Sequence, residues 1–262
     1  MPLLKTPAIS LKSRKWGEAD RIVTFYTLRF GKIRGVARGA RRMKSRFGSV
    51  LEPFVHSDLN LFEKRGDPLY RVSQADIRES HVGLRADLDL MTAAARLTNL
   101  VDAVTAEGDA GPRIFQTLLD GFHALQMDDD PALTSLLFQI RLLGQTGFRP
   151  QTDHCSACGD PPRPALTARA VFSPVSGGLV CEPCAHRVRD RCLPLSPGSL
   201  ALMQQAIRWQ PTVVTRLKAE RQVRAETETA IDAYVTVVAG RRLPSVNFLV
   251  AESAPVVYGS KR

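Results

Sequence analysis

Two Cys-x-x-Cys pairs constrain the fold of this chain more than any other feature of its 262 residues. The first pair is Cys155 and Cys158, and the second is Cys181 and Cys184. Each pair can present two thiolates to one ion from a tight turn, and two pairs complete the tetrahedron that Zn²⁺ prefers. Because four thiolates leave no open position for water or substrate, the spacing predicts one structural Zn²⁺ ion.

The segment between the two pairs is typical of a β-hairpin. AVFSPV and GLV flank Ser176-Gly177-Gly178, a composition that favours a tight turn between strands. We therefore predict a zinc ribbon over residues 151–186. Two disulfides and a duplicated thioredoxin-like redox pair are the alternatives. The opening MPLLKTPAIS lacks the apolar run of a signal peptide, which favours a reducing cytosol, and the strand–helix context of thioredoxin is missing.

The positive charge of the chain is concentrated at its N-terminal end. The formal net charge is +10, and residues 1–50 alone hold 13 Lys and Arg against two acidic residues. Residues 85–145 hold four basic residues against nine acidic ones. Such an excess of positive charge argues for an anionic partner, most often nucleic acid. Segments of opposite charge in one chain indicate separate functional surfaces.

The stretch GKIRGVARGARRMKSRF, residues 31–47, contains seven basic residues and no acidic one. A core cannot hold so much unpaired charge, so the stretch must lie at a surface. A solvated face is the simplest interpretation, but the glycines of the stretch and nearby aromatics favour phosphate binding, with Trp16 as a stacking platform. The predicted DNA-binding residues are Arg14, Lys15, Lys32, Arg34, Arg38, Arg41, Arg42, Lys44 and Arg46.

A second group of basic residues lies near the C-terminal end of the chain. It is opposed locally only by Glu220, and a solvated helix face is its alternative interpretation. The second basic patch consists of Arg208, Arg216, Lys218, Arg221 and Arg224.

The periodicity of the sequence changes once along the chain. Residues 1–80 contain five short runs rich in β-branched and aromatic residues, which fit a five-stranded OB-fold barrel. From about residue 84 apolar residues recur at helical spacing, and Ser196-Pro197 indicates a helix N-cap. We predict an α+β multidomain fold: an OB-fold over 1–80, an α-helical domain over 81–150 and 187–250, the inserted ribbon, and a tail over 251–262.

These segments together resemble the RecO family of bacterial recombination mediators. The resemblance rests on AISLKSRKWGEADRIVTFYT, GKIRGVARGARRMKSRFGSVLEPF, the two cysteine pairs and the closing AGRRLPSVNFL. It implies binding of single- and double-stranded DNA without sequence specificity and annealing of complementary strands. It also implies work with RecR to load RecA onto strands coated by single-stranded-DNA-binding protein (SSB).

The resemblance further implies binding of the SSB C-terminal tail. We place that tail on the second basic patch, because the acidic helices expected over 85–145 would repel an acidic peptide. No catalytic residues are implied, and no P-loop or nucleophile–base motif occurs in the sequence. We expect a cytoplasmic, nucleoid-associated protein, since no apolar run is long enough to span a membrane.

Three other functions compete with this interpretation. A metal-dependent nuclease would need clustered carboxylates, and the basic region offers Glu18 and Asp20 alone. An RNA-binding or ribosome-associated protein with an OB-fold and a zinc ribbon would prefer structured RNA to single-stranded DNA. A scaffold without nucleic-acid contacts would be indifferent to charge reversal in the basic stretch.

Overall fold

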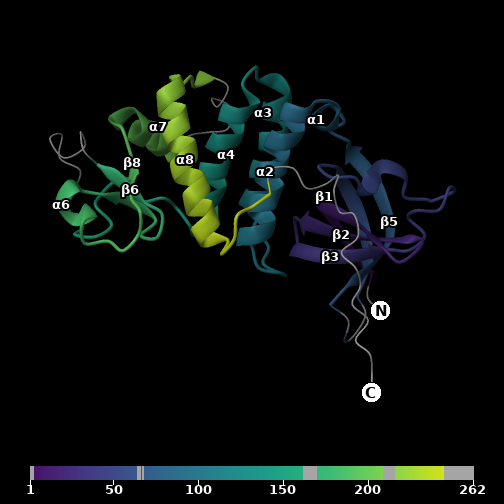
Figure 1. The fold of residues 1–262 in the computed structure, drawn as a ribbon. Coiled ribbons are helices and arrows are strands. Elements are labelled where there is room, and N and C mark those ends of the chain that lie inside the picture. The colour runs from purple at the N-terminus through teal and green to yellow at the C-terminus, as the bar shows by residue number, and fades with distance from the viewer. Residues whose placement is uncertain (1–2, 64–65, 67, 162–169, 209–215, 245–262) are drawn as a thin grey trace.

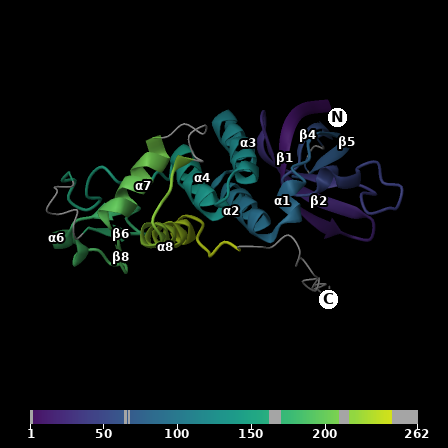
Figure 2. The same cartoon turned by 90° about the horizontal axis from the view of Figure 1, so that it is seen from above.

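A computed structural model of the chain describes residues 3–63, 66, 68–161, 170–208 and 216–244. A β-barrel lies at one end of the molecule and a small ribbon sheet at the other, with helices between them (Figures 1 and 2). The predicted tail over 251–262 lies outside the described residues. Among the helices that are described, none combines the length and the hydrophobicity that a membrane span requires.

The N-terminal barrel is closed by five strands in the order β1-β2-β3-β5-β4. The strands are β1 (Leu3–Trp16), β2 (Asp20–Thr27), β3 (Gly31–Ala37), β4 (His56–Phe62) and β5 (Tyr70–Glu79). The pair β3 and β5 is parallel, the other pairs are antiparallel, and β1 closes the barrel onto β4. This barrel confirms the OB-like fold predicted for the N-terminal region.

Alternating burial explains why these segments form a barrel. In β3 every second residue from Gly31 is buried, while the residues between them are partly exposed. Val23 and Phe25 of β2 and Leu59 of β4 fill the barrel interior. The pairing of β1 with β2 shifts between Ser10 and Lys12, and an irregularity of this kind lets a long strand curve around a barrel.

Helices form the middle of the molecule and confirm the predicted helical domain. The described helices are α1 (Gly83–Ala86), α2 (Leu88–Val104), α3 (Pro112–Met127), α4 (Pro131–Gln145), α6 (Glu182–Ala185), α7 (Pro197–Arg208), α8 (Arg221–Val238) and the 3₁₀ helix η1 (Gly48–Leu51). Asp87 and Asp130 cap α2 and α4 through their carboxylates. Ser196 caps α7 as predicted, since its Oγ accepts a hydrogen bond from Ser199 N.

The ribbon segment forms a three-stranded sheet in the order β7-β6-β8. The strands β6 (Val171–Ser173) and β7 (Gly178–Val180) make the predicted hairpin, and β8 (Leu193–Pro194) pairs with β6. The sheet therefore extends beyond residue 186, where we expected the ribbon to end. Phe172 of β6 packs edge-to-face on Tyr234 of α8 with ring centroids 5.9 Å apart, which fixes the sheet to the helices.

One apolar cluster spans the barrel, the helices and the ribbon, beside separate clusters inside the barrel and around the cysteines. Ile9 and Tyr26 of the barrel, Leu118 of α3 and Phe172 of β6 all belong to one cluster of buried residues. The turn that begins β3 comes so close to the helices that a Cβ on Gly31 would lie 2.0 Å from the carbonyl oxygen of Asp109. The barrel is thus packed directly on the helical domain.

Candidate nucleic-acid interface and metal centre

A basic groove with aromatic walls lies at one end of the barrel. It has a volume of about 930 Å³ and is formed by the end of β1, the loop after β3 and the start of β5. The residues that line it are Trp16, Asp20, Val36, Arg38, Gly39, Arg42, Lys44, Ser45, Arg46, Leu69, Tyr70 and Arg71. Asp20 is the single acidic residue among them, so the groove presents a strongly positive surface.

The exposed aromatic side chain predicted from the sequence lies in this groove. Trp16 is 51% exposed at the end of β1, whereas Phe25, Tyr26 and Phe47 are buried in the cores. Trp16 therefore offers a flat apolar face beside arginine side chains. Such a combination holds single-stranded nucleic acid through base stacking and phosphate contacts.

Hydrogen bonds hold the basic loop over residues 38–46 in place. The carboxylate of Asp20 accepts a hydrogen bond of 2.8 Å from Gly39 N. Arg41 donates to the carbonyl oxygens of Gly17 and Glu18, at 3.2 and 2.8 Å. Arg41 thus ties the loop to the turn between β1 and β2, and its guanidinium is less available to a ligand than that of Arg38 or Arg42.

Two residues of the predicted set face the helical domain. Lys32 donates to the carbonyl oxygen of Asp102 at 2.5 Å, and Arg34 pairs with Glu107 at 2.8 Å. The sequence contains no acidic residue near them, and their partners come from the end of α2 and the loop after it. The lack of an acidic residue within the stretch therefore does not leave these two side chains unpaired.

Arg14 and Lys15 are exposed on β1, on the approach to Trp16. Arg14 lines a smaller hollow of about 320 Å³ that it shares with Lys32, Arg34 and the acidic partners of that pair. The groove therefore takes four of the predicted residues and the junction of the barrel with the helices takes three, while Lys15 and Arg41 line neither.

The groove also contains residues that sequence reasoning missed. Tyr70 and Arg71 reach it from the start of β5, far along the chain from the basic stretch. The signal available in the sequence was an aromatic residue next to a basic one at the start of a predicted strand. The glycines of the stretch serve the fold as well, since a Cβ on Gly35 would lie 2.8 Å from Val72.

The four cysteines of the ribbon form one cluster that could hold a metal ion. Their sulfur atoms all lie within 4.8 Å of one another, and those of Cys158 and Cys181 are 3.9 Å apart. Two sulfurs on a zinc tetrahedron with bonds of about 2.3 Å are about 3.8 Å apart, so the spacing fits Zn²⁺. The backbone N–H groups of Ala157 and Cys181 each point to the sulfur of Cys155 at 3.4 Å.

The electrostatics of the cluster also suit a cation. Burial raises the pKa of the Cys155 thiol, but hydrogen bonds from Cys181, Cys158 and Ala157 outweigh it and lower that pKa to about 6. Hydrogen bonding with Cys181, together with burial and crowding by the other thiols, raises the pKa of Cys184 to about 12. A divalent cation at the centre offsets this crowding and favours four thiolates.

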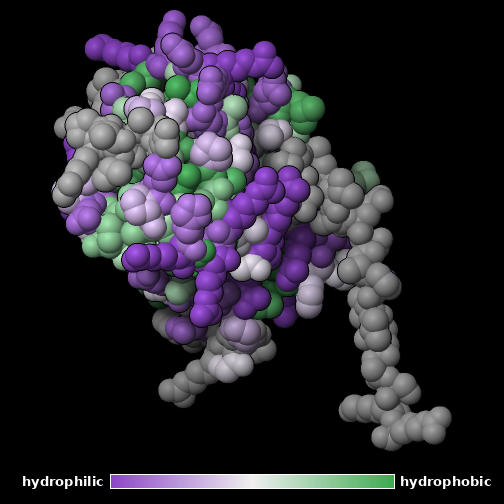
Figure 3. All heavy atoms as spheres, turned by 60° about the vertical axis from the view of Figure 1, so that its left-hand side comes forward, coloured by the Kyte–Doolittle hydropathy of each residue, from purple (hydrophilic) through white to green (hydrophobic). Residues whose placement is uncertain are grey.

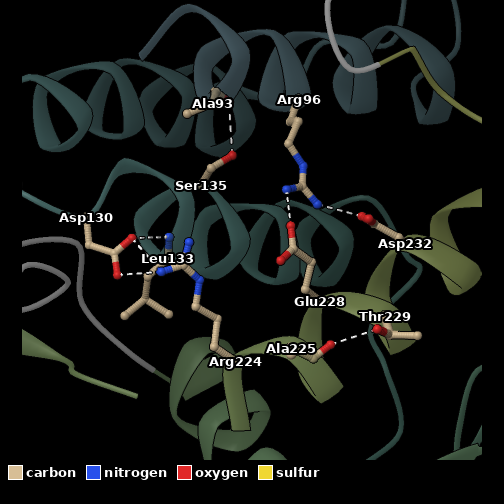
Figure 4. Close-up of polar contacts among 10 residues, drawn as sticks. All are labelled: Ala93, Arg96, Asp130, Leu133, Ser135, Arg224, Ala225, Glu228, Thr229 and Asp232. Atoms are coloured by element: carbon tan, nitrogen blue, oxygen red, sulfur yellow. Dashed lines mark hydrogen bonds and ion pairs between the residues drawn. The ribbon is translucent and has the colours of Figure 1, made fainter. Parts of the chain in front are cut away.

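The second basic patch is partly neutralised in the folded protein. Arg208 pairs with Asp153 at 3.2 Å, and Arg224 makes two bonds to the carboxylate of Asp130 (Figure 4). Both acidic partners are distant in sequence, so Glu220 is the local acidic residue of the patch but not the only one that opposes it. Arg216, Lys218 and Arg221 remain exposed. The view with the ribbon end turned forward shows hydrophilic side chains interspersed with hydrophobic ones on that face (Figure 3).

The fold and the two sites define a class of protein: an OB-like barrel with a basic, aromatic-walled groove, joined through helices to a four-cysteine ribbon. Comparison with known families agrees with that class. Residues 1–81 match the family described as Recombination protein O N terminal, and residues 85–246 match Recombination protein O C terminal. The chain therefore belongs to the RecO family.

Individual relatives are similar over most of their length. A DNA repair protein RecO of Desulforamulus reducens is 32% identical over 249 residues, which cover 95% of this chain and 94% of the relative. One from Heliobacterium modesticaldum is 36% identical over 219 residues, covering 83% and 78%. One from Myxococcus xanthus is 31% identical over 245 residues, covering 92% and 95%.

Proposed function

We propose that the protein is a DNA repair and recombination mediator that binds single- and double-stranded DNA without sequence specificity and anneals complementary strands. The observation that carries the proposal is the groove in which Trp16 and Tyr70 lie beside Arg38, Arg42 and other basic residues. Phosphates bind the basic side chains, and bases stack on the aromatic rings. Membership of the RecO family supports the same conclusion.

Annealing follows from the charge of the groove. Two DNA strands repel each other through their phosphates, and a basic surface that holds both lowers that repulsion. Contacts to the backbone leave the hydrogen-bonding edges of the bases free to pair. No covalent bond is formed or broken in such a reaction, so the proposal assigns no catalytic residue and describes a mediator, not an enzyme.

The metal proposed for Cys155, Cys158, Cys181 and Cys184 is one structural Zn²⁺ ion. The four thiolates would complete its coordination, so the ion would fold the ribbon and leave no position for a substrate. The separations of the sulfur atoms support this assignment. Removal of the ion is expected to unfold the ribbon.

The proposed partners are those of the RecO family. They are RecR, the SSB C-terminal tail and, indirectly, RecA, which the protein helps to load onto SSB-coated strands at the nucleoid. For the acidic tail we retain the second basic patch, now reduced to the three members outside the ion pairs with Asp153 and Asp130. These are Arg216, Lys218 and Arg221. Arg208 and Arg224 already pair with carboxylates of this chain and contribute less.

The groove can be tested by reversing its charge. We expect the variant Arg38→Glu, Arg42→Glu, Arg46→Glu to bind a single-stranded oligonucleotide at least about tenfold more weakly at physiological salt. The same variant should fail to anneal complementary oligonucleotides coated with SSB. Annealing is followed by the transfer of fluorescence energy between labels on the two strands. Arg41 is left unchanged because it holds the loop.

A matched control reverses three charges elsewhere. Lys5, Arg29 and Arg113 are exposed, and the first two lie at the opposite end of β1 and β2 from the groove. The variant Lys5→Glu, Arg29→Glu, Arg113→Glu has the same net charge and should keep most of the binding, because salt screens charges this distant. Equal losses of DNA binding in both variants would contradict a specific binding groove. A preference of the wild type for structured RNA would favour the ribosome-associated alternative.

A further inference from the structure

A cluster of ionisable side chains lies where the barrel meets the helices, away from the DNA groove and the four cysteines. Glu79 is the last residue of β5, His81 follows it in the turn before α1, and His123 lies on α3. One ligand atom from each lies within 4.8 Å of the other two. Figures 1 and 2 show α1 on the side of the helices that faces the barrel.

The carboxylate of Glu79 faces both imidazoles. Its Oε2 lies 2.8 Å from His123 Nε2, and its Oε1 lies 3.5 Å from His81 Nδ1. The two rings have centroids 5.3 Å apart. Two ligand atoms on a zinc tetrahedron with bonds of about 2.05 Å are about 3.4 Å apart. The observed separations of 2.8 and 3.5 Å therefore need little adjustment for the three side chains to hold one ion.

The hydrogen bonds of Gln126 determine which atom of His81 carries a lone pair. Gln126 Nε2 donates to the carbonyl oxygen of Phe122 at 3.1 Å, which sets the orientation of the amide. The same nitrogen lies 3.2 Å from His81 Nδ1, so Nδ1 accepts a hydrogen bond and carries no proton. The lone pair of His81 is therefore on Nδ1, the atom that also lies 3.5 Å from Glu79 Oε1.

Two acceptors then face each other across 3.5 Å, namely His81 Nδ1 and Glu79 Oε1. A cation between them removes the repulsion, and the cation can be a proton or a metal ion. A metal ion satisfies both atoms together with His123.

We propose that Glu79, His81 and His123 form a second metal site, which binds one divalent transition-metal ion of the zinc type. Two imidazoles and a carboxylate suit such ions and not Mg²⁺ or Ca²⁺, which prefer oxygen ligands. His123 and Glu79 are about half exposed, so an ion can enter from solvent and water can complete its coordination. On binding, the ion replaces the Gln126 hydrogen bond to Nδ1.

The bound ion would join the barrel to the helical domain. Two of its ligands lie at and just after the end of β5, and the third lies on α3, whose Phe122 packs against both His81 and Phe54. The ion would therefore stabilise the relative position of the DNA groove and the helices. This inference does not depend on the proposed DNA binding.

The test uses full-length protein whose four cysteines are already loaded with one Zn²⁺ per chain. Zn²⁺ is then titrated against a chromophoric chelator, and the number of ions bound per chain is measured. Wild type should bind a second ion. Glu79→Gln and His123→Gln, both changes of half-exposed side chains, should lower the affinity for that ion by more than about 100-fold, since the loss of an outer-shell partner alone costs about 10–100-fold.

Two further measurements and a control variant separate this site from the ribbon and from a general loss of fold. A second Co²⁺ ion should add visible absorption without the thiolate charge-transfer band that cysteine ligands produce. The variant His186→Gln removes an exposed histidine outside the cluster and should keep the second ion. Added Zn²⁺ should raise the melting temperature of wild type and not of Glu79→Gln. Wild type that binds a single ion, or variants that all keep the second one, would overturn the proposal.

Discussion

At the scale of single residues, Glu226 shows how one carboxylate can organise a helix end. It lies on α8, and its Oε2 accepts hydrogen bonds from Ser196 N at 3.0 Å and Ser199 Oγ at 2.8 Å, at the start of α7. Hydrogen bonds from Ser196 above all, then from Gln222 and Ser199, outweigh burial and lower the pKa of Glu226 to about 2. A charged Glu226 therefore stabilises the fold.

The variant Glu226→Gln tests this contribution through pH. The pKa in the folded state is below the ordinary value of 4.5, so the stabilisation is present above about pH 4.5 and is lost as the pH falls toward 2. Because the side chain is partly exposed, we expect the variant to lose about 1 kcal/mol at neutral pH. Urea unfolding of both proteins across this pH range measures the difference, and a difference that stays constant down to about pH 2.5 would contradict the assignment.

At the scale of secondary-structure elements, Arg96 joins α2 to α8. Its guanidinium lies 2.5 Å from Glu228 and 2.6 Å from Asp232, which are one turn apart on α8 (Figure 4). The Arg96 side chain is 17% exposed. Without it, two like charges on one helix face would remain next to each other and partly desolvated.

We expect Arg96→Met to lower the free energy of unfolding by about 2 kcal/mol, since it leaves both carboxylates without their partner. Arg149→Met is the matched control. Arg149 pairs with Asp153 at 3.0 Å but is half exposed, so its loss should cost less than about 0.5 kcal/mol. Urea unfolding measures both values, and equal costs would show that the α2–α8 contact does not depend on this ion pair.

At the scale of the whole molecule, Gly31 governs how the barrel packs on the helices. Its φ is +60°, and a Cβ there would collide with the backbone of Asp109. Gly17 has a similar φ of +56°, but nothing lies within 4 Å of its Cβ position. Comparing alanine substitutions at the two glycines therefore distinguishes the cost of backbone strain from the cost of crowding the contact between two domains.

Gly17→Ala should cost about 1 kcal/mol from strain alone, and Gly31→Ala should cost clearly more. Because Gly31→Ala separates the barrel from the helices, the unfolding of that variant should also cease to be two-state. Trp16 fluorescence in a Trp209→Phe background reports on the barrel, and circular dichroism reports on the helices. Coincident transitions and equal costs in the two variants would contradict a tightly packed junction.

How much of this structure could be predicted from the sequence depends on whether a feature is encoded by a local pattern. The barrel strands, the helices and the four-cysteine cluster follow from local spacing, so the sequence predicts them directly. The pairs of Lys32 with Asp102 and of Arg34 with Glu107 join residues about seventy positions apart, and no local pattern indicates them. The same holds for the approach of His123 to Glu79 and for the entry of Tyr70 into the groove.

The central claim is that the groove beside Trp16 is the DNA-binding surface. The most direct measurement is the fluorescence of Trp16 in a Trp209→Phe variant, titrated with a single-stranded oligonucleotide across a salt series. The groove offers Arg38, Arg42, Lys44, Arg46 and Arg71 to phosphates. We predict quenching that saturates with binding, and a slope of log K against log salt of about −3.5, for about five phosphate contacts. Tight binding that leaves the emission of Trp16 unchanged would contradict the claim and place DNA elsewhere on the protein.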